Sequence, residues 1–331
     1  MSRSQMLRHL FLDLPIVVLI VAFVVYQSHS TSSLLPWTTK AGGDAAAGAQ
    51  MHSASSSSTT TTTKAPVYFF SHGGPDVQYN TQHPAYAVLQ SIGKEITQKV
   101  KPKAVVVFSA HWQATSNEIH LNNAEDTDLI YDFYGFPAKF YQAKYPSKGD
   151  PQLAARILSL LGGAGIFARG LKRGLDHGVF SGFNVAFSPE ENPLGVPLVQ
   201  VSLFKNEDPD AHYRLGRAVA SLRDDNIVII CTGMSVHNLR DMSLDPQPLP
   251  YAISFDNALK GAVESPPDVR QERMAALTTR RDAKQAHPWM DHLMPVYVAA
   301  GAAGSDFGKQ TWTMQEGSFA WAQYRFGEVP S

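Results

Sequence analysis

The ten residues KAVVVFSAHW, 103–112, decide the fold. A lysine opens this stretch, a run of apolar and small residues follows, and a histidine stands next to its end. Because apolar residues fill consecutive rather than alternate positions, the stretch predicts a β-strand that is buried on both faces. Two other stretches have the same form: APVYFFSHGGP, 65–75, and NIVIICTGMSVHNL, 226–239.

Segments with helical periodicity separate these strands along the chain. Further strands are predicted at 196–203 and 318–326. Amphipathic spacing and glycine stops predict helices at 84–100, 150–165, 211–225, 251–263 and 268–283. The alternation of helices with fully apolar strands predicts an α/β fold, with a central, mostly parallel sheet flanked by helices on both faces.

The N-terminal part of the chain has a different composition. The stretch 14–26 carries no charge, and Ala/Gly-rich and Ser/Thr-rich segments follow it. We expect a hydrophobic signal or anchor segment over 1–30, a disordered low-complexity linker over 31–64, and a catalytic domain over 65–331. Residues 10–26 fall short of the roughly 20 apolar residues of a spanning helix, so membrane anchoring and secretion both stay open, as does a cytoplasmic location if the segment is not used.

Charge and cysteine content exclude some classes of protein. The 331 residues carry a net charge of −1, which gives no basic surface for nucleic acid. The one cysteine, Cys231, excludes an intramolecular disulfide framework and a zinc site built from several cysteines.

Histidines follow three of the apolar strands, where small residues end each run. They are His72, His111 and His237. The carboxyl ends of parallel strands form the ligand crevice of α/β sheets, so the three imidazoles form a candidate site for iron, zinc or manganese. His177 in LDHGVF and His292 in HPWMDHL lie beside turns and are further candidates.

Several motifs then follow one another in a fixed order: FFSHGGP, VVVFSAHW, IYDFYGFP, LDHGVF, VHNLR and AHPWMDHLMPVYVAAGAAG. Together they resemble the class III extradiol ring-cleavage dioxygenases of the LigB type, in particular their 4,5-DOPA dioxygenase branch. The resemblance covers roughly 66–326. It implies a non-haem Fe(II) enzyme, with Zn(II) as an alternative metal, that binds a catechol through both hydroxyls, takes up O₂ and opens the ring beside the hydroxyls.

The resemblance also assigns metal ligands, motif by motif. His72 and His111 match the two metal-binding histidines of the first motifs. His292 matches the remaining metal position, and the neighbouring Asp291 is an alternative ligand. His237 matches a position that is a metal ligand in the DOPA branch and an acid/base in the protocatechuate enzymes, so both roles stay open.

His177 matches a histidine that contacts a substrate oxygen, and with His237 it is the predicted catalytic residue. A neutral imidazole is suited to accept a proton from a catechol near pH 7. We expect Asp176 to orient His177 and to contribute to substrate binding, and Gly178 to allow a close backbone approach.

Tyr131 and Tyr134 are candidate substrate-binding residues, with packing as the alternative for Tyr131. The other histidines of the folded part are expected to serve as surface, core or capping residues: His83, His120, His212 and His287. Two other functions use the same residues: a zinc-dependent hydrolase with a metal-bound water, and a non-catalytic binding protein on the same fold.

Overall fold

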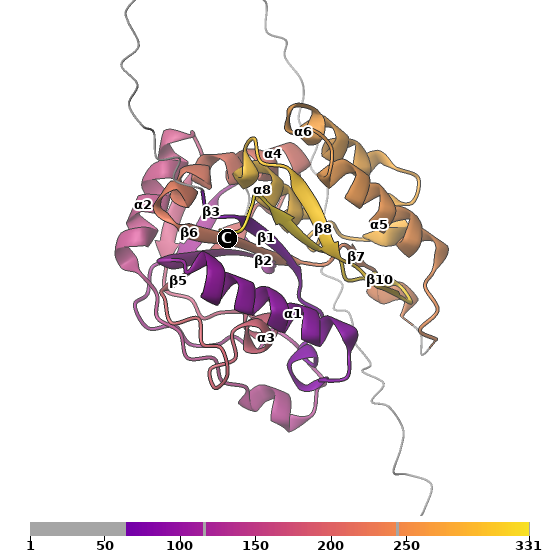
Figure 1. The fold of residues 1–331 in the computed structure, drawn as a ribbon, viewed down its shortest axis with the longest axis horizontal. Coiled ribbons are helices and arrows are strands. Elements are labelled where there is room, and N and C mark those ends of the chain that lie inside the picture. The colour runs from indigo at the N-terminus through magenta and orange to yellow at the C-terminus, as the bar shows by residue number, and fades with distance from the viewer. Residues whose placement is uncertain (1–63, 115–116, 243–244, 331) are drawn as a thin grey trace, which may run out of the picture.

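The computed structural model describes residues 64–114, 117–242 and 245–330. Within these residues the centre is an eight-stranded sheet with the order β4-β3-β5-β2-β6-β1-β11-β8 (Figure 1). Its strands are β1 (Val67–Ser71), β2 (Ala104–Gln113), β3 (Ile119–Asn122), β4 (Ala168–Leu171), β5 (Leu198–Leu203), β6 (Ile227–Gly233), β8 (Gly308–Trp312) and β11 (Gln323–Phe326). A smaller sheet contains β7 (Val236–His237), β10 (Phe319–Ala320) and β9 (Gln315–Glu316).

The middle of the large sheet is parallel. Strand β2 pairs in parallel with β5 and β6, and β6 pairs in parallel with β1. Strands β11 and β8 extend one edge in antiparallel fashion. The predicted α/β class with a mostly parallel sheet is therefore confirmed. The strand predicted at 318–326 is instead divided into β10 and β11, which belong to different sheets.

Helices cover both faces of the sheet, as Figure 1 shows. They are α1 (Pro84–Glu95), α2 (Pro151–Gly163), α3 (His177–Ala186), α4 (Pro209–Val219), α5 (Pro250–Val263), α6 (Pro267–Ala275), α7 (Ala283–Ala286) and α8 (Met294–Ala303). Phe69 packs in one core with α2, α4 and α8, whereas its neighbours Tyr68 and Phe70 pack in a second core with α1 and α3. Successive strand side chains point to opposite faces, so each strand must be apolar throughout.

Two helices were not predicted, and three predicted helices are not α-helical to their end: 84–100 ends in a π-helix, Ile96–Val100, and 211–225 in a 3₁₀ helix, Ala220–Asp225. The residues of α8 are all buried, as are nearly all those of α3, so neither helix shows an amphipathic period. The helix predicted at 268–283 breaks into α6, a 3₁₀ turn at Ala276–Thr279, and α7. The hydroxyls of Thr278 and Thr279 donate to backbone carbonyls in that turn, which favours a non-helical path.

The predicted signal or anchor segment, 1–30, lies outside the described residues, and so does the predicted linker up to residue 63. None of the helices in the described part of the chain has the length and apolar character needed to cross a membrane.

Candidate active site

Three neighbouring parallel strands bring the first histidines to one edge of the sheet. His72 directly follows β1, His111 lies near the end of β2, and His237 follows β6 in the short strand β7. The rings of His72 and His111 have centroids 5.3 Å apart. His237 joins this group through His292, against which its ring is stacked.

His177 and His292 complete a cluster of five imidazoles. His177 is the first residue of α3, and its ring centroid lies 3.9 Å from that of His111. His292 precedes α8, and its centroid lies 5.5 Å from that of His72 and 4.9 Å from that of His111. All five histidines singled out in the sequence therefore meet at the carboxyl edge of the central strands.

Four of the five rings have an oxygen acceptor at Nδ1, and three of these are His72, His111 and His292. The Nδ1 atom of His72 lies 2.6 Å from the carbonyl oxygen of Gly73, and that of His292 lies 3.0 Å from Oδ1 of Asp291. The Nδ1 atom of His111 lies 3.0 Å from a carboxylate oxygen of Asp132. An acceptor at Nδ1 places the ring proton there and leaves the lone pair on Nε2.

Candidate ligand atoms of His72, His111 and His177 lie within 4.8 Å of one another, and so do those of His237, Asp291 and His292. The Nε2 atoms of His111 and His292, which are 3.1 Å apart, join the two groups. The Nε2 atom of His72 is buried and has no hydrogen-bond partner within the described structure. Nitrogen ligands at about 2.0–2.1 Å from a shared divalent ion lie about 3–3.5 Å from one another, so the separation of the His111 and His292 Nε2 atoms fits a shared metal.

Burial keeps most of these imidazoles in the form that binds metal. Desolvation, followed by repulsion from neighbouring histidines, holds the pKa of His72 and of His292 well below the ordinary value. Burial also opposes protonation of His111, but the hydrogen bond and charge of Asp132 outweigh it and raise its pKa. Metal ligation requires the neutral ring, which His72 and His292 therefore offer at neutral pH.

Asp132 is the site residue that the sequence reasoning missed. Its Oδ1 atom accepts from the backbone N–H and from Nδ1 of His177, both at 2.9 Å, while Oδ2 faces His111. Burial favours the neutral acid, but the two imidazole donors prevail and hold the pKa of Asp132 far below its usual range. The acid inside the motif IYDFYGFP was the available signal.

Asp132 therefore makes the orienting contact to His177 that we had predicted for Asp176. The carboxylate of Asp176 is fully buried and accepts from Ser109 Oγ at 2.7 Å, Arg173 Nη1 at 3.0 Å and Gln200 Nε2 at 2.5 Å. These donors surround the carboxylate of Asp176, and none of its atoms is exposed for the substrate contact that the sequence predicted.

Gly178 has the close approach that the sequence suggested. A Cβ atom at this position would lie 2.6 Å from Ser109 Oγ and 2.7 Å from His111 Cδ2. The start of α3 can therefore pack against β2 beside His111 only without a side chain here.

The two tyrosines differ in their surroundings. The hydroxyl of Tyr131 donates to the carbonyl of Ala143, and its ring packs against Phe133 and Phe180, as the packing alternative expects. Tyr134 is 84% exposed. A role in substrate binding remains a prediction for both.

The other four histidines of the described residues are buried or cap a helix. His83 accepts from the N–H of Ala85 and caps α1. His212 and His287 are fully buried, and His120 is buried beside Glu118. Burial of His120, His212 and His287 agrees with the core or packing roles expected for them, whereas His83, expected on the surface or in the core, is a helix cap.

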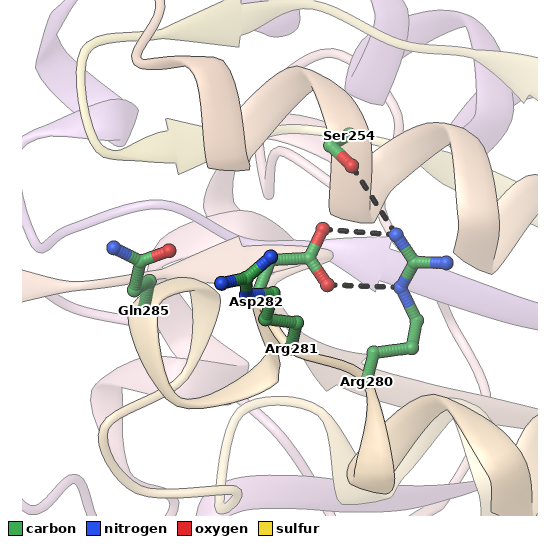
Figure 2. A pocket seen from close by; sticks show the side chains of 5 residues that line it. All are labelled: Ser254, Arg280, Arg281, Asp282 and Gln285. Atoms are coloured by element: carbon green, nitrogen blue, oxygen red, sulfur yellow. Dashed lines mark hydrogen bonds and ion pairs between the residues drawn. The ribbon is translucent and has the colours of Figure 1, made fainter.

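A surface pocket of about 560 Å³ is lined by none of the five clustered histidines, and Figure 2 shows the side chains that do line it. Its lining consists of Ser254, Arg280, Arg281, Asp282 and Gln285. Arg280 donates to both carboxylate oxygens of Asp282 and to Ser254, so its guanidinium already has partners.

Comparison with known proteins gives consistent matches. Residues 59–327 match the family described as the catalytic LigB subunit of aromatic ring-opening dioxygenase. A 4,5-DOPA dioxygenase extradiol from Beta vulgaris is 37% identical over 242 residues, which cover 72% of this chain and 87% of that one. A protein of the same name from Escherichia coli K12 is 29% identical, covering 72% and 85%. The crystal structure of an uncharacterized Escherichia coli K12 protein aligns with a TM-score of 0.65 and 25% identity, over 80% of this chain and 100% of that one.

Proposed function

This chain belongs to the LigB family and is an extradiol ring-opening dioxygenase, and on that premise we propose that it opens a catechol with O₂ at a divalent metal, Fe(II), held by the histidine cluster. The 3.1 Å approach of the Nε2 atoms of His111 and His292 carries this proposal, together with the buried, unpartnered Nε2 atom of His72 and the oxygen acceptors at Nδ1 of all three rings. The names of the relatives support a substrate of the DOPA type.

The proposed ligands are His72, His111 and His292. Asp291 supports His292 rather than replacing it, because its Oδ1 atom already accepts from Nδ1 and from the backbone N–H of His292. Three protein ligands leave coordination positions open for other molecules. When bound, the metal would act as a Lewis acid and as a path for electrons between a catecholate and O₂.

His237 is better suited to proton transfer than to ligation beside His292. The two rings are stacked with centroids 3.7 Å apart and an angle of 11° between their planes. An imidazole donates its lone pair in the plane of its ring, so an ion bound by both rings would have to lie in both planes. The two planes are nearly parallel and do not meet close to the rings. We therefore assign His237 the acid/base role. Burial, followed by repulsion from His292, holds its pKa well below the ordinary value, so the ring is neutral near pH 7.

His177 is the proposed contact to a substrate oxygen. Its Nδ1 proton is directed to Asp132, which leaves Nε2 as an acceptor. Burial, and then the proximity of His111, lowers the pKa of His177, so this ring is also neutral near pH 7. A neutral acceptor within hydrogen-bond reach of a catechol hydroxyl can take its proton as the substrate binds.

The experiment uses the full-length chain, purified without oxygen and loaded with either Fe(II) or Zn(II). Each form is mixed with L-DOPA and with simple catechols in air, while O₂ uptake and visible absorbance are recorded. We expect one O₂ consumed per catechol and a coloured ring-opened product with Fe(II), because Zn(II) has no redox chemistry. Metal bound without O₂ uptake on any catechol would contradict the proposal.

A further inference from the structure

The carboxylate of Asp132 lies between His111, the proposed metal ligand, and His177, the proposed substrate contact. Asp132 accepts three hydrogen bonds: the backbone N–H and Nδ1–H of His177 at Oδ1, and Nδ1–H of His111 at Oδ2. Resting on the function proposed above, we propose that Asp132 is a positioning residue that sets the same tautomer on both rings. It would thereby prepare His111 to bind metal and His177 to face the substrate.

The argument begins with the proton positions. A carboxylate accepts hydrogen bonds and donates none, so both rings must place their protons on Nδ1. Both Nε2 atoms then carry lone pairs. With the opposite tautomer, the proton of His111 would lie on its Nε2 atom, which is 3.1 Å from Nε2 of His292. His111 could then not bind metal through Nε2.

The loop that carries Asp132 is held on both sides, so the carboxylate has a fixed place. Before it, the N–H of Ile130 donates to the carbonyl of Leu175 at 2.7 Å. After it, Phe133 is buried, and its ring lies edge-on to that of His177 with centroids 5.5 Å apart. These contacts fix the separation between the carboxylate and both imidazoles without help from a metal.

The substitution Asp132→Asn tests this role more sharply than removal of the side chain. The amide oxygen must face the backbone N–H of His177, since that group can only donate. The amide N–H₂ then faces Nδ1 of His111, where it can only donate. Asp132→Asn therefore drives His111 to the tautomer with its proton on Nε2, while His177 keeps its proton on Nδ1.

The first readout is the ring tautomer, measured by long-range ¹H–¹⁵N NMR on the metal-free protein at about pH 8.5, roughly two units above the ordinary histidine pKa. We expect Nδ1–H on His111 and His177 in the wild type, and Nε2–H on His111 alone in Asp132→Asn. The proposal is overturned if wild-type His111 carries its proton on Nε2, or if Asp132→Asn leaves it on Nδ1.

The second readout is the dissociation constant for Zn(II). We expect Asp132→Asn to weaken binding about 100-fold and Asp132→Ala about 10-fold, because alanine leaves His111 free to adopt either tautomer. A purely structural role predicts the reverse order, since asparagine keeps the shape of the side chain, and that order would overturn the proposal.

Asp126→Asn in the same loop is the matched control. Asp126 is exposed and pairs with Lys148, so this variant should bind Zn(II) like the wild type. If the wild type bound no metal, the proposed function would fail, whereas the tautomers of the metal-free protein would still decide the role of Asp132.

Discussion

The Nε2 atoms of His111 and His292 lie 3.1 Å apart, although the two residues are separated by 181 positions in the chain. Each ring has an oxygen acceptor at Nδ1, so each offers a lone pair at Nε2. Two lone pairs at this distance repel each other unless a proton or a cation lies between them. A metal ion removes that repulsion, so ion binding is expected to stabilise the fold as well as supply chemistry.

The first prediction decides whether His292 or Asp291 is the third metal ligand. His292→Gln should lower metal affinity by more than 100-fold, because a ligand atom is lost. Asp291→Asn should lower it only about 10-fold, because Asp291 orients His292 without replacing it. Metal titration of both full-length variants by calorimetry checks this order. An equal or greater loss in Asp291→Asn would make Asp291 the ligand.

The second prediction concerns His177. His177→Ala should keep the metal bound and lower turnover by about 10²–10⁴-fold, which is the usual contribution of a positioned proton acceptor. Metal content per chain and the rate of O₂ uptake are measured on the same sample. Loss of the metal from this variant would identify His177 as a ligand instead.

The third prediction tests the contact between α3 and β2. Gly178→Ala should destabilise the fold by about 1–3 kcal/mol and weaken metal binding, because the new methyl group would meet Ser109 and His111. Gly261→Ala in α5 is the matched control, since a Cβ there would lie within 4 Å of no atom beyond its chain neighbours and the nearby backbone of its own helix. That control should be neutral or stabilising by up to about 1 kcal/mol. Chemical unfolding curves that rank the two variants the other way would contradict the packing described.

Much of this arrangement could be predicted from the sequence because it follows from strand composition. Consecutive apolar residues mark strands covered on both faces, and the ends of such strands lie at one edge of the sheet. That is why His72, His111 and His237 could be assigned to one site from the sequence alone. His177 and His292 lie next to turns, and they were assigned by motif rather than by strand geometry.

The details that set the chemistry could not be predicted in the same way. Asp132 lies in a loop without periodicity, and its role depends on hydrogen bonds to residues 21 and 45 positions away in the chain, His111 and His177. The stacking of His237 on His292 depends on side-chain orientation, which the order of the strands does not determine. For the same reason Asp176 was mistaken for the partner of His177, its neighbour in sequence.

The fourth prediction is a pH dependence of stability that comes from His212. Burial, opposed by hydrogen bonding to Asp208 and Phe204, lowers the pKa of His212 to about 4. Between the unfolded value near 6.5 and this folded value, only the unfolded chain takes up the proton. Stability is therefore lost as pH falls through that window, by about 1.4 kcal/mol per pH unit for this group.

His212→Asn should retain one donor and one acceptor while removing the titration. We expect it to be less stable than the wild type above pH 7, with the difference shrinking as pH falls from 6.5 toward 4. Urea unfolding at several pH values measures this. A difference that stays constant over the window would exclude His212 as the source.

The fifth prediction concerns the proposed catalytic domain, 65–331. The backbone N–H of Ala65 donates to the carbonyl of Arg223, and the Arg223 side chain donates back to the carbonyl of Ala65 at 2.6 Å. A chain that begins at Lys64 keeps both contacts. Its melting temperature and ring-opening activity should match those of the full chain, and failure to fold would refute the boundary.

The most direct test of the central claim is a crystal structure of the metal-loaded protein, with anomalous scattering recorded at the absorption edge of the metal. The account predicts one anomalous peak about 2.1 Å from the Nε2 atoms of His72, His111 and His292, with His177 and His237 outside coordination distance. A peak bound by His237 or His177 in place of one of these ligands, or no peak at the histidine cluster, would contradict it.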